Sequence, residues 1–274
     1  PAAVQINLNG CGWCGSDGNK QGALDFTLAA FTLSAKVAVK SPSCIRASAG
    51  SIVSGVLTGS QPLRVSPQSI GSLPSDNISF TNAANTYHGT MTVDNTTLIL
   101  SASTLQYADI VLERAGRISA SGTIGSLASA DQTTYWVQNS GNSYINANGE
   151  TTFAGRFIGD GVNARNYWLE GGEENILHLT HTSVATGHTG TLYARNGSKV
   201  FLENGTKFTG DTGQVRISLG STLGANTTTS TVTFLYMDTG AILDVKAINA
   251  TTASKITSTN SMESSGGYKV NVPA

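Results

Sequence analysis

The stretch Asn85–Leu100, NTYHGTMTVDNTTLIL, decides how this chain is expected to fold. A tyrosine stands two positions before a glycine, and apolar residues then alternate with Thr, Asn and Asp. Such alternation predicts a β-strand with one face in a core, because successive side chains of a strand point to opposite sides. The stretch therefore predicts short half-buried strands, and its recurrence in the chain would identify the architecture.

The pattern does recur, at Thr186–Leu202, TGHTGTLYARNGSKVFL. His188 stands there in the place of Tyr87, 101 residues further along, and one inserted residue brings the closing apolar pairs into line. A repeat over so long a distance indicates stacked coils, because a β-sandwich gives no reason for it.

Shorter spacings indicate the length of one coil. Turns at Asn196-Gly197, Gly220 and Gly240 follow one another at intervals of about 20 to 23 residues, a typical rung of a β-solenoid. A sandwich would instead show turns every 8–12 residues. The spacing predicts a mostly parallel β-solenoid of about 10–13 coils.

The rest of the chain agrees with an all-β fold. Gly22–Lys40 has the only helix-like pattern, but its apolar residues also alternate, which favours strands. Further alternating runs span residues 4–8, 91–93, 110–112, 192–194, 200–202, 215–217, 232–236, 242–244 and 268–272.

The composition narrows the classes of partner. Charged residues make up only 12% of the chain, glycine is frequent at 31 of 274 residues, and the net charge is −1. Low charge suits a solenoid, because like charges would otherwise stack on neighbouring rungs about 4.8 Å apart. The lack of a basic stripe predicts no nucleic-acid partner, and apolar runs this short predict no membrane insertion.

The repeated stretch resembles a known family. NTYHGTMTVDNTTLIL is similar to the autotransporter-associated β-strand repeat of bacterial secreted passengers, with matches at Asn85, Thr86, Tyr87, Gly89, Val93, Thr97, Leu98 and Leu100. Thr151–Gly161 and Trp168–Thr180 resemble later parts of the same cycle, with Glu170 where lysine is usual. The resemblance implies a right-handed parallel β-solenoid that is secreted, associated with the cell surface and without catalysis of its own.

Three cysteines, Cys11, Cys14 and Cys44, characterise the N-terminal part. The CGWC motif lies among turn residues with no helix behind it, which argues against a redox site. We expect instead an extracellular disulfide from Cys44 to Cys11 or Cys14, with one thiol left over that is available to a neighbouring subunit. Residues 1–45 are interpreted as an irregular head that contains these cysteines, and residues 46–274 as the solenoid body.

No catalytic, cofactor or metal site is predicted. The acidic residues are dispersed, and the adjacent Glu173 and Glu174 would face opposite sides of a strand. Stacked rungs could still bring together two of Glu170, Glu173, Glu174, Glu203, Asp211, Asp238 and Asp244, as a glycosidase requires. The four histidines are expected in surface or turn positions, and the spacing of His178 and His181 does not suit zinc.

Two further features concern the surface. Aromatic residues gather at Tyr135-Trp136, Tyr144 and Tyr167-Trp168, where they either form a sugar-binding platform or cover the core. Asn196 and Asn204 lie in predicted turns and are the best candidates for glycosylation, if the host glycosylates.

These observations lead to a functional hypothesis. The terminal strands (Val4, Ile6 and Leu8; Tyr268, Val270 and Val272) alternate and carry almost no charge, so each leaves an open sheet edge. We expect a non-catalytic extracellular or cell-surface protein, either a self-assembling fibre or sheath subunit that forms head-to-tail filaments or an adhesive passenger. Host or environmental glycans are a second class of partner. The alternative is a polysaccharide-binding or polysaccharide-degrading β-helix similar to a phage tailspike.

Overall fold

The structure is a computed structural model in which residues 4–11, 22–26, 30–68, 76–100, 102–138, 141–146, 149–159, 165–183, 188–208, 213–227, 229–249 and 252–272 are described. The chain divides into two compact units. Unit 1 comprises Pro1–Ser126 and Thr133–Tyr135, and unit 2 comprises Leu127–Gln132 and Trp136–Ala274. All regular structure in the described residues is β-strand, which confirms the predicted fold class.

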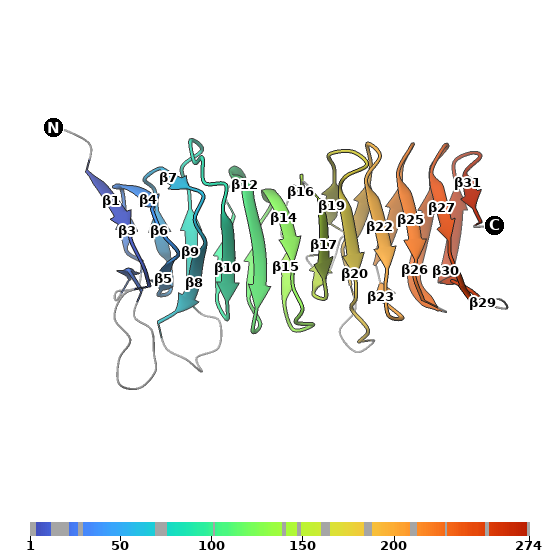
Figure 1. The fold of residues 1–274 in the computed structure, drawn as a ribbon, viewed down its shortest axis with the longest axis horizontal. Helices are drawn as coiled ribbons and strands as arrows, with labels where there is room; N and C mark the ends of the chain where they lie inside the picture. The colour runs from blue at the N-terminus through green and yellow to red at the C-terminus, as the bar shows by residue number, and fades with distance from the viewer. Residues whose placement is uncertain are drawn as a thin grey trace. The chain divides into compact units, whose positions relative to one another are not determined.

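Unit 1 contains three parallel sheets (Figure 1), with the strand orders β1-β4-β7, β2-β5-β8-β10-β12 and β3-β6-β9-β11-β13. Neighbours in each sheet are two or three strands apart in sequence, as expected when each coil adds one strand to every sheet. The strands are β1 (Gln5–Leu8), β2 (Leu24–Asp25), β3 (Thr32–Leu33), β4 (Lys36–Val39), β5 (Ser43–Ala47), β6 (Ser51–Val53), β7 (Leu57–Gly59), β8 (Leu63–Pro67), β9 (Asn77–Phe80), β10 (Thr90–Asp94), β11 (Thr97–Ile99), β12 (Ala102–Glu113) and β13 (Arg117–Ser119).

Unit 2 repeats this arrangement with two long parallel sheets, β16-β19-β21-β24-β26-β30 and β17-β20-β22-β25-β27-β31. Its strands are β16 (Asn142–Ile145), β17 (Glu150–Phe153), β18 (Arg156–Ile158), β19 (Asn166–Leu169), β20 (Ile176–Leu179), β21 (Thr191–Ala194), β22 (Lys199–Leu202), β23 (Lys207–Phe208), β24 (Gln214–Ile217), β25 (Thr222–Ala225), β26 (Ser230–Met237), β27 (Ile242–Val245), β28 (Ala247–Asn249), β29 (Thr252–Ala253), β30 (Ile256–Ser264) and β31 (Lys269–Asn271). β14 (Gly122–Ala128) and β15 (Tyr135–Val137) each carry residues of both units.

The coils vary in length. Lys199 pairs with Thr222 and Thr222 with Ile242, rungs of 23 and 20 residues, which confirms the spacing read from the turns. Ile242 pairs with Lys269 over 27 residues. The rung length therefore changes from coil to coil along unit 2.

Inward rows of apolar side chains form the core. In unit 1 Ile45, Val65, Val93 and Leu112 occupy one register position on successive strands, and all are buried. Each row continues from rung to rung, so every coil buries its apolar face against its neighbours. The alternation in the sequence thus predicts which residues form the core.

The repeated stretch explains two buried rings. Tyr87 and His188, which the repeat aligns, are both buried. The Tyr87 hydroxyl lies 2.9 and 2.8 Å from the carbonyl oxygens of Gln61 and Thr90. In both copies of the repeat, this position therefore holds a ring that is buried inside the coil.

The N-terminal region is strand-forming where it is described. β2, β3 and β4 lie within Gly22–Lys40, so the preference for strands there is confirmed. The boundary predicted at residue 45 stays a prediction. β5, which spans that residue, pairs with β2 on one side and with β8 on the other.

Candidate functional site

A disulfide ties the first strand segment to the body of unit 1. Cys11 and Cys44 are bonded, with Cα atoms 4.5 Å apart, so the expected disulfide is confirmed with Cys11 as the partner of Cys44. Cys14 lies outside the described residues. The disulfide closes a loop of 33 residues, which stabilises the fold by about 3–4 kcal/mol in the chain-entropy model. It also indicates a non-reducing environment.

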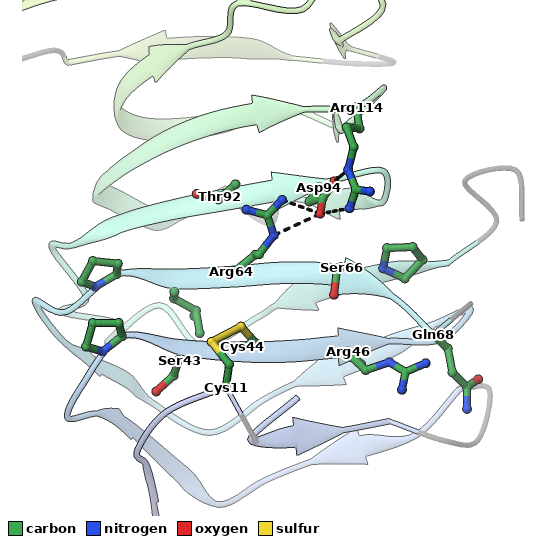
Figure 2. A pocket seen from close by; sticks show the side chains of 14 residues that line it. Cys11, Ser43, Cys44, Arg46, Arg64, Ser66, Gln68, Thr92, Asp94 and Arg114 are labelled. Atoms are coloured by element: carbon green, nitrogen blue, oxygen red, sulfur yellow. Dashed lines mark hydrogen bonds and ion pairs between the residues drawn. A yellow bond between two sulfur atoms is a disulfide. The ribbon is translucent and has the colours of Figure 1, made fainter. Parts of the chain in front are cut away.

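Beside the disulfide, unit 1 has a surface pocket with a volume of about 550 Å³, drawn in Figure 2. We call it the arginine groove. It lies across β5, β8 and β10, and it is lined by Arg46, Arg64, Arg114, Asp94 and small polar side chains, together with Pro42, Pro62 and Pro67. The volume is within the range of small-ligand pockets in proteins.

The alternation of each strand places these residues on the outer face. Ile45, Val65 and Val93 point into the core, so the residues directly before and after each of them on its strand point outward. Register then aligns Cys44 with Arg64 and Thr92, and it aligns Arg46 with Ser66. Asp94 follows Val93, which is the partner of Val65. Residues that are up to 50 positions apart in sequence therefore become neighbours on one surface.

Asp94 organises the two arginines beside it. Its carboxylate is only 1% exposed and accepts hydrogen bonds from Arg64 Nε at 3.0 Å, Arg64 Nη2 at 2.6 Å and Arg114 Nε at 2.5 Å. Burial by itself would raise the pKa of Asp94, but the hydrogen bonds and charges of Arg114 and Arg64 outweigh burial and lower it. Asp94 is thus an ionised anchor that fixes two guanidinium groups at the surface.

Other carboxylates stand at the border of the groove. Glu113 Oε2 lies 2.8 Å from Arg64 Nη2, and Glu113 does not line the groove itself. Asp25 lies 3.6 Å from Arg46, a long ion pair. Within the described residues no cluster of three or more His, Cys, Asp or Glu side chains has the arrangement of a metal site.

Unit 2 presents a different outer face, which we call the aromatic ladder. One outward register position on five successive strands holds Tyr144, Trp168, Tyr193, Arg216 and Tyr236. All five side chains are half-buried. Parallel stacking brings identical positions of neighbouring rungs close together, so these groups contact one another along the sheet.

The rings of the ladder cover each other's faces. Trp168 and Tyr193 stack with centroids 4.0 Å apart at an interplanar angle of 20°. The Arg195 guanidinium also lies over the Trp168 ring, 4.2 Å from its centroid. Arg216 lies 5.8 and 5.9 Å from the ring centroids of Tyr193 and Tyr236. Because sugars stack on free ring faces, this arrangement stabilises the sheet better than it would hold a sugar.

The predicted aromatic cluster is divided between core and surface. Trp136 and Tyr167 are buried in unit 2, with the Tyr167 hydroxyl 2.8 Å from the Trp136 carbonyl oxygen. Burial raises the pKa of Tyr167 above its ordinary value. Tyr144 and Trp168 belong to the aromatic ladder, and Tyr135 lies in unit 1 beneath the Arg117 guanidinium, 4.7 Å from the ring centroid.

Several candidate carboxylates pair with basic groups on neighbouring rungs. The pairs are Glu170 with Arg195, Glu203 with His178 at 2.6 Å, and Asp238 with Arg216 at 3.1 Å. Such pairs connect one coil to the next. Glu173 and Glu174 are exposed in a turn, Asp244 is half-buried on β27, and Asp211 lies outside the described residues.

Two histidines occupy the core of unit 2, so the expectation of surface or turn positions was wrong for them. His181 and His188 are fully buried, and their rings meet edge to face at 5.2 Å. His188 Nδ1 accepts a hydrogen bond from the Phe157 amide at 3.1 Å, and its ring stacks on Phe208 at 4.0 Å. Burial, and then His181 and Arg156, lower the pKa of His188 well below its ordinary value. The alignment of His188 with Tyr87 was the sequence signal for this burial.

The remaining predicted positions lie at turns and ends. Asn196 and Asn204 are exposed and have positive φ angles of 59° and 52°, and their glycosylation stays a prediction. β1 and β31 are the end strands of their sheets. Val4, Val270, Val272 and Tyr268 are exposed there, Ile6 is half-buried and Leu8 is buried.

No protein-family model, curated protein or solved structure matches the chain. In the part of the chain that is described, no helix is long and apolar enough to cross a membrane.

Proposed function

We propose that this chain is an extracellular structural β-solenoid, non-catalytic, that assembles head to tail through its terminal strands. The observation that carries the proposal is the position of β1 and β31, which each end a sheet and, among the described strands, each pair with one strand. A strand with one partner leaves a row of backbone groups available to another chain.

At the first end, the unpaired backbone groups can be identified. The carbonyls of Val4 and Leu8 accept hydrogen bonds from the amides of Lys36 and Lys40 at 3.1 and 2.9 Å. Backbone groups of a strand alternate between its two sides, so the N–H and C=O of Asn7 point away from β4. They are positioned to pair with a strand of a second subunit.

At the C-terminal strand β31, backbone groups likewise face away from the neighbouring strand. The Lys269 amide donates to the Ala241 carbonyl at 2.9 Å, so the backbone groups of Val270 point away from β27. The Val270 and Val272 side chains are 51% and 70% exposed. A contact between two different ends repeats without closing, and it therefore produces a filament.

Further features support a structural protein outside the cell. The Cys11–Cys44 disulfide suits an oxidising compartment. The ion pairs and stacked rings between rungs stiffen the solenoid, which is what a fibre subunit or an adhesive passenger requires. The resemblance to secreted passenger repeats is in line with the same proposal.

Replacement of Val270 by proline tests the assembly. Val270→Pro removes the N–H that faces outward and leaves the bond from Lys269 intact, so we expect filaments to disappear from electron micrographs while the melting temperature is unchanged. Val270→Ala is the matched control, because it shortens the side chain but keeps the N–H, and it should still form filaments. Asn7→Pro should have the same effect at the other end. A wild-type protein that stays monomeric in light scattering at high concentration would contradict the proposal.

A further inference from the structure

The arginine groove plays no part in the proposed assembly, since it lies on the outer face of β5, β8 and β10 and not on a terminal strand. Its arginines are held in place before any ligand arrives. Arg64 and Arg114 each use Nε and Nη2 to bind Asp94, which leaves Nη1 of each guanidinium for another acceptor. Figure 2 shows Arg64, from β8, and Arg114, from the turn after β12, both reaching Asp94 at the end of β10.

The charge of the groove favours an anion. Three arginines line it against one carboxylate, Asp94, which is buried under two of them. Guanidinium groups bind carboxylates through paired, charge-assisted hydrogen bonds. Glu113, 44% exposed at the border, accepts a second hydrogen bond from Arg64 Nη2, so a ligand carboxylate that pairs with Nη1 and Nη2 of Arg64 displaces it.

The remaining lining suits a sugar. Ser66, Thr92 and Gln68 supply neutral donors and acceptors for hydroxyl groups, while Pro42 and Pro62 supply rigid apolar walls. The described lining contains no aromatic ring, so a nucleobase would find no stacking partner. The groove is open to solvent, so a chain longer than the pocket can continue beyond it.

We infer that the arginine groove binds an acidic oligosaccharide, with a sugar carboxylate on Arg64 and Arg114 and the sugar hydroxyls on Ser66, Thr92 and Gln68. This site does not depend on head-to-tail assembly. A monomeric protein would keep the site, and a filament would present one copy for each subunit.

Calorimetric titration of the whole chain with trimers of galacturonate, mannuronate and guluronate tests the inference. At least one uronate trimer should bind at one site per chain, and the affinity should fall as salt is raised, because the contact is ionic. Maltotriose, a neutral trimer, should bind at least about 10-fold more weakly, since one charge-assisted pair contributes that much. Inorganic phosphate should also bind more weakly, because it cannot use the hydroxyl-binding residues.

Variants assign the binding to the groove. Arg64→Gln and Arg114→Gln should each weaken uronate binding about 10-fold or more. Glu113→Gln should strengthen it, since a competing carboxylate is removed, and a gain in affinity cannot come from a misfolded protein. Arg216→Gln in unit 2, another outward arginine paired with an aspartate, is the matched control and should leave the affinity unchanged.

The inference is overturned by any of three results. The first is that no uronate trimer binds. The second is that maltotriose or phosphate binds as tightly as the uronates. The third is that Arg216→Gln weakens binding as much as Arg64→Gln. Each result leaves the assembly proposal untouched, because that proposal is tested by filaments.

Discussion

The outer faces of the two units use the same backbone and differ in chemistry. In unit 1 the outward row around Asp94 is connected by ion pairs, and in unit 2 the row around Trp168 is connected by stacked rings. Parallel rungs bring equivalent positions into contact, so the residue type at one position decides how neighbouring coils adhere. A charged row leaves polar groups that a ligand can use, whereas a ladder of rings uses its own faces.

Removal of the buried carboxylate should have the largest effect. Asp94→Asn removes the carboxylate that Arg64 and Arg114 share and leaves Glu113 as the partner of Arg64. We expect the free energy of unfolding to fall by about 2–3 kcal/mol in urea denaturation. The loss is smaller than for a fully buried pair, because both arginines are partly exposed.

The matched control for this change is Asp238→Asn in unit 2, where the carboxylate that pairs with Arg216 is 24% exposed, against 1% for Asp94. We expect this variant to cost about 1 kcal/mol or less. Equal costs for the two variants would show that burial of Asp94 contributes nothing special to unit 1.

Truncation of the ladder should have an intermediate effect. Trp168→Ala removes the stack with Tyr193 and the contact with Arg195, and we expect a loss of about 1–2 kcal/mol in the same assay. Thr92→Ala, at an outward position of unit 1, should cost less than about 0.5 kcal/mol. The Trp168 effect should persist in 0.5 M salt while the Asp94 effect shrinks, and the reverse dependence on salt would refute the distinction between the faces.

The smallest expected effect is a loss of stability in mild acid, which should be seen in unit 2 and not in unit 1. Because the folded pKa of His188 is depressed, the unfolded chain binds more protons below its ordinary pKa of about 6.5. Stability of unit 2 is therefore complete above that pH and should fall by about 1 kcal/mol between pH 6.5 and 5.5. The depressed pKa of Asp94 has the same sign at lower pH, so its contribution is lost only as the pH falls below about 4.

Hydrogen exchange measured for each unit would resolve these two acid effects. His188→Asn keeps an acceptor for the Phe157 amide but cannot titrate, so it should remove the decline of unit 2 near pH 6. His88→Asn changes an exposed histidine and should not. A decline that survives in His188→Asn would assign the sensitivity to other groups.

The pattern of residue types along the chain was sufficient to predict the β-solenoid fold. Alternation at Met91 and Val93 predicted half-buried strands, and turns near Asn196, Gly220 and Gly240 predicted the rung length. These features are local or strictly periodic, so the order of residues is enough to identify them. The disulfide was anticipated, but its choice of Cys11 was not.

The candidate site depended on register between distant segments. Arg64 meets Asp94 from 30 positions away and Glu113 from 49. A shift of one residue in either strand would turn these side chains to the core. The coil lengths vary from 19 residues between Thr90 and Asp109 to 31 between Gln5 and Lys36, and this variation hides the register from any fixed period. The sequence by itself thus determined the strands, the coil and the core rows, because hydrophobic alternation carries them. Only the tertiary structure decided which outward charges and rings meet, because contacts across coils depend on the length of every turn between them.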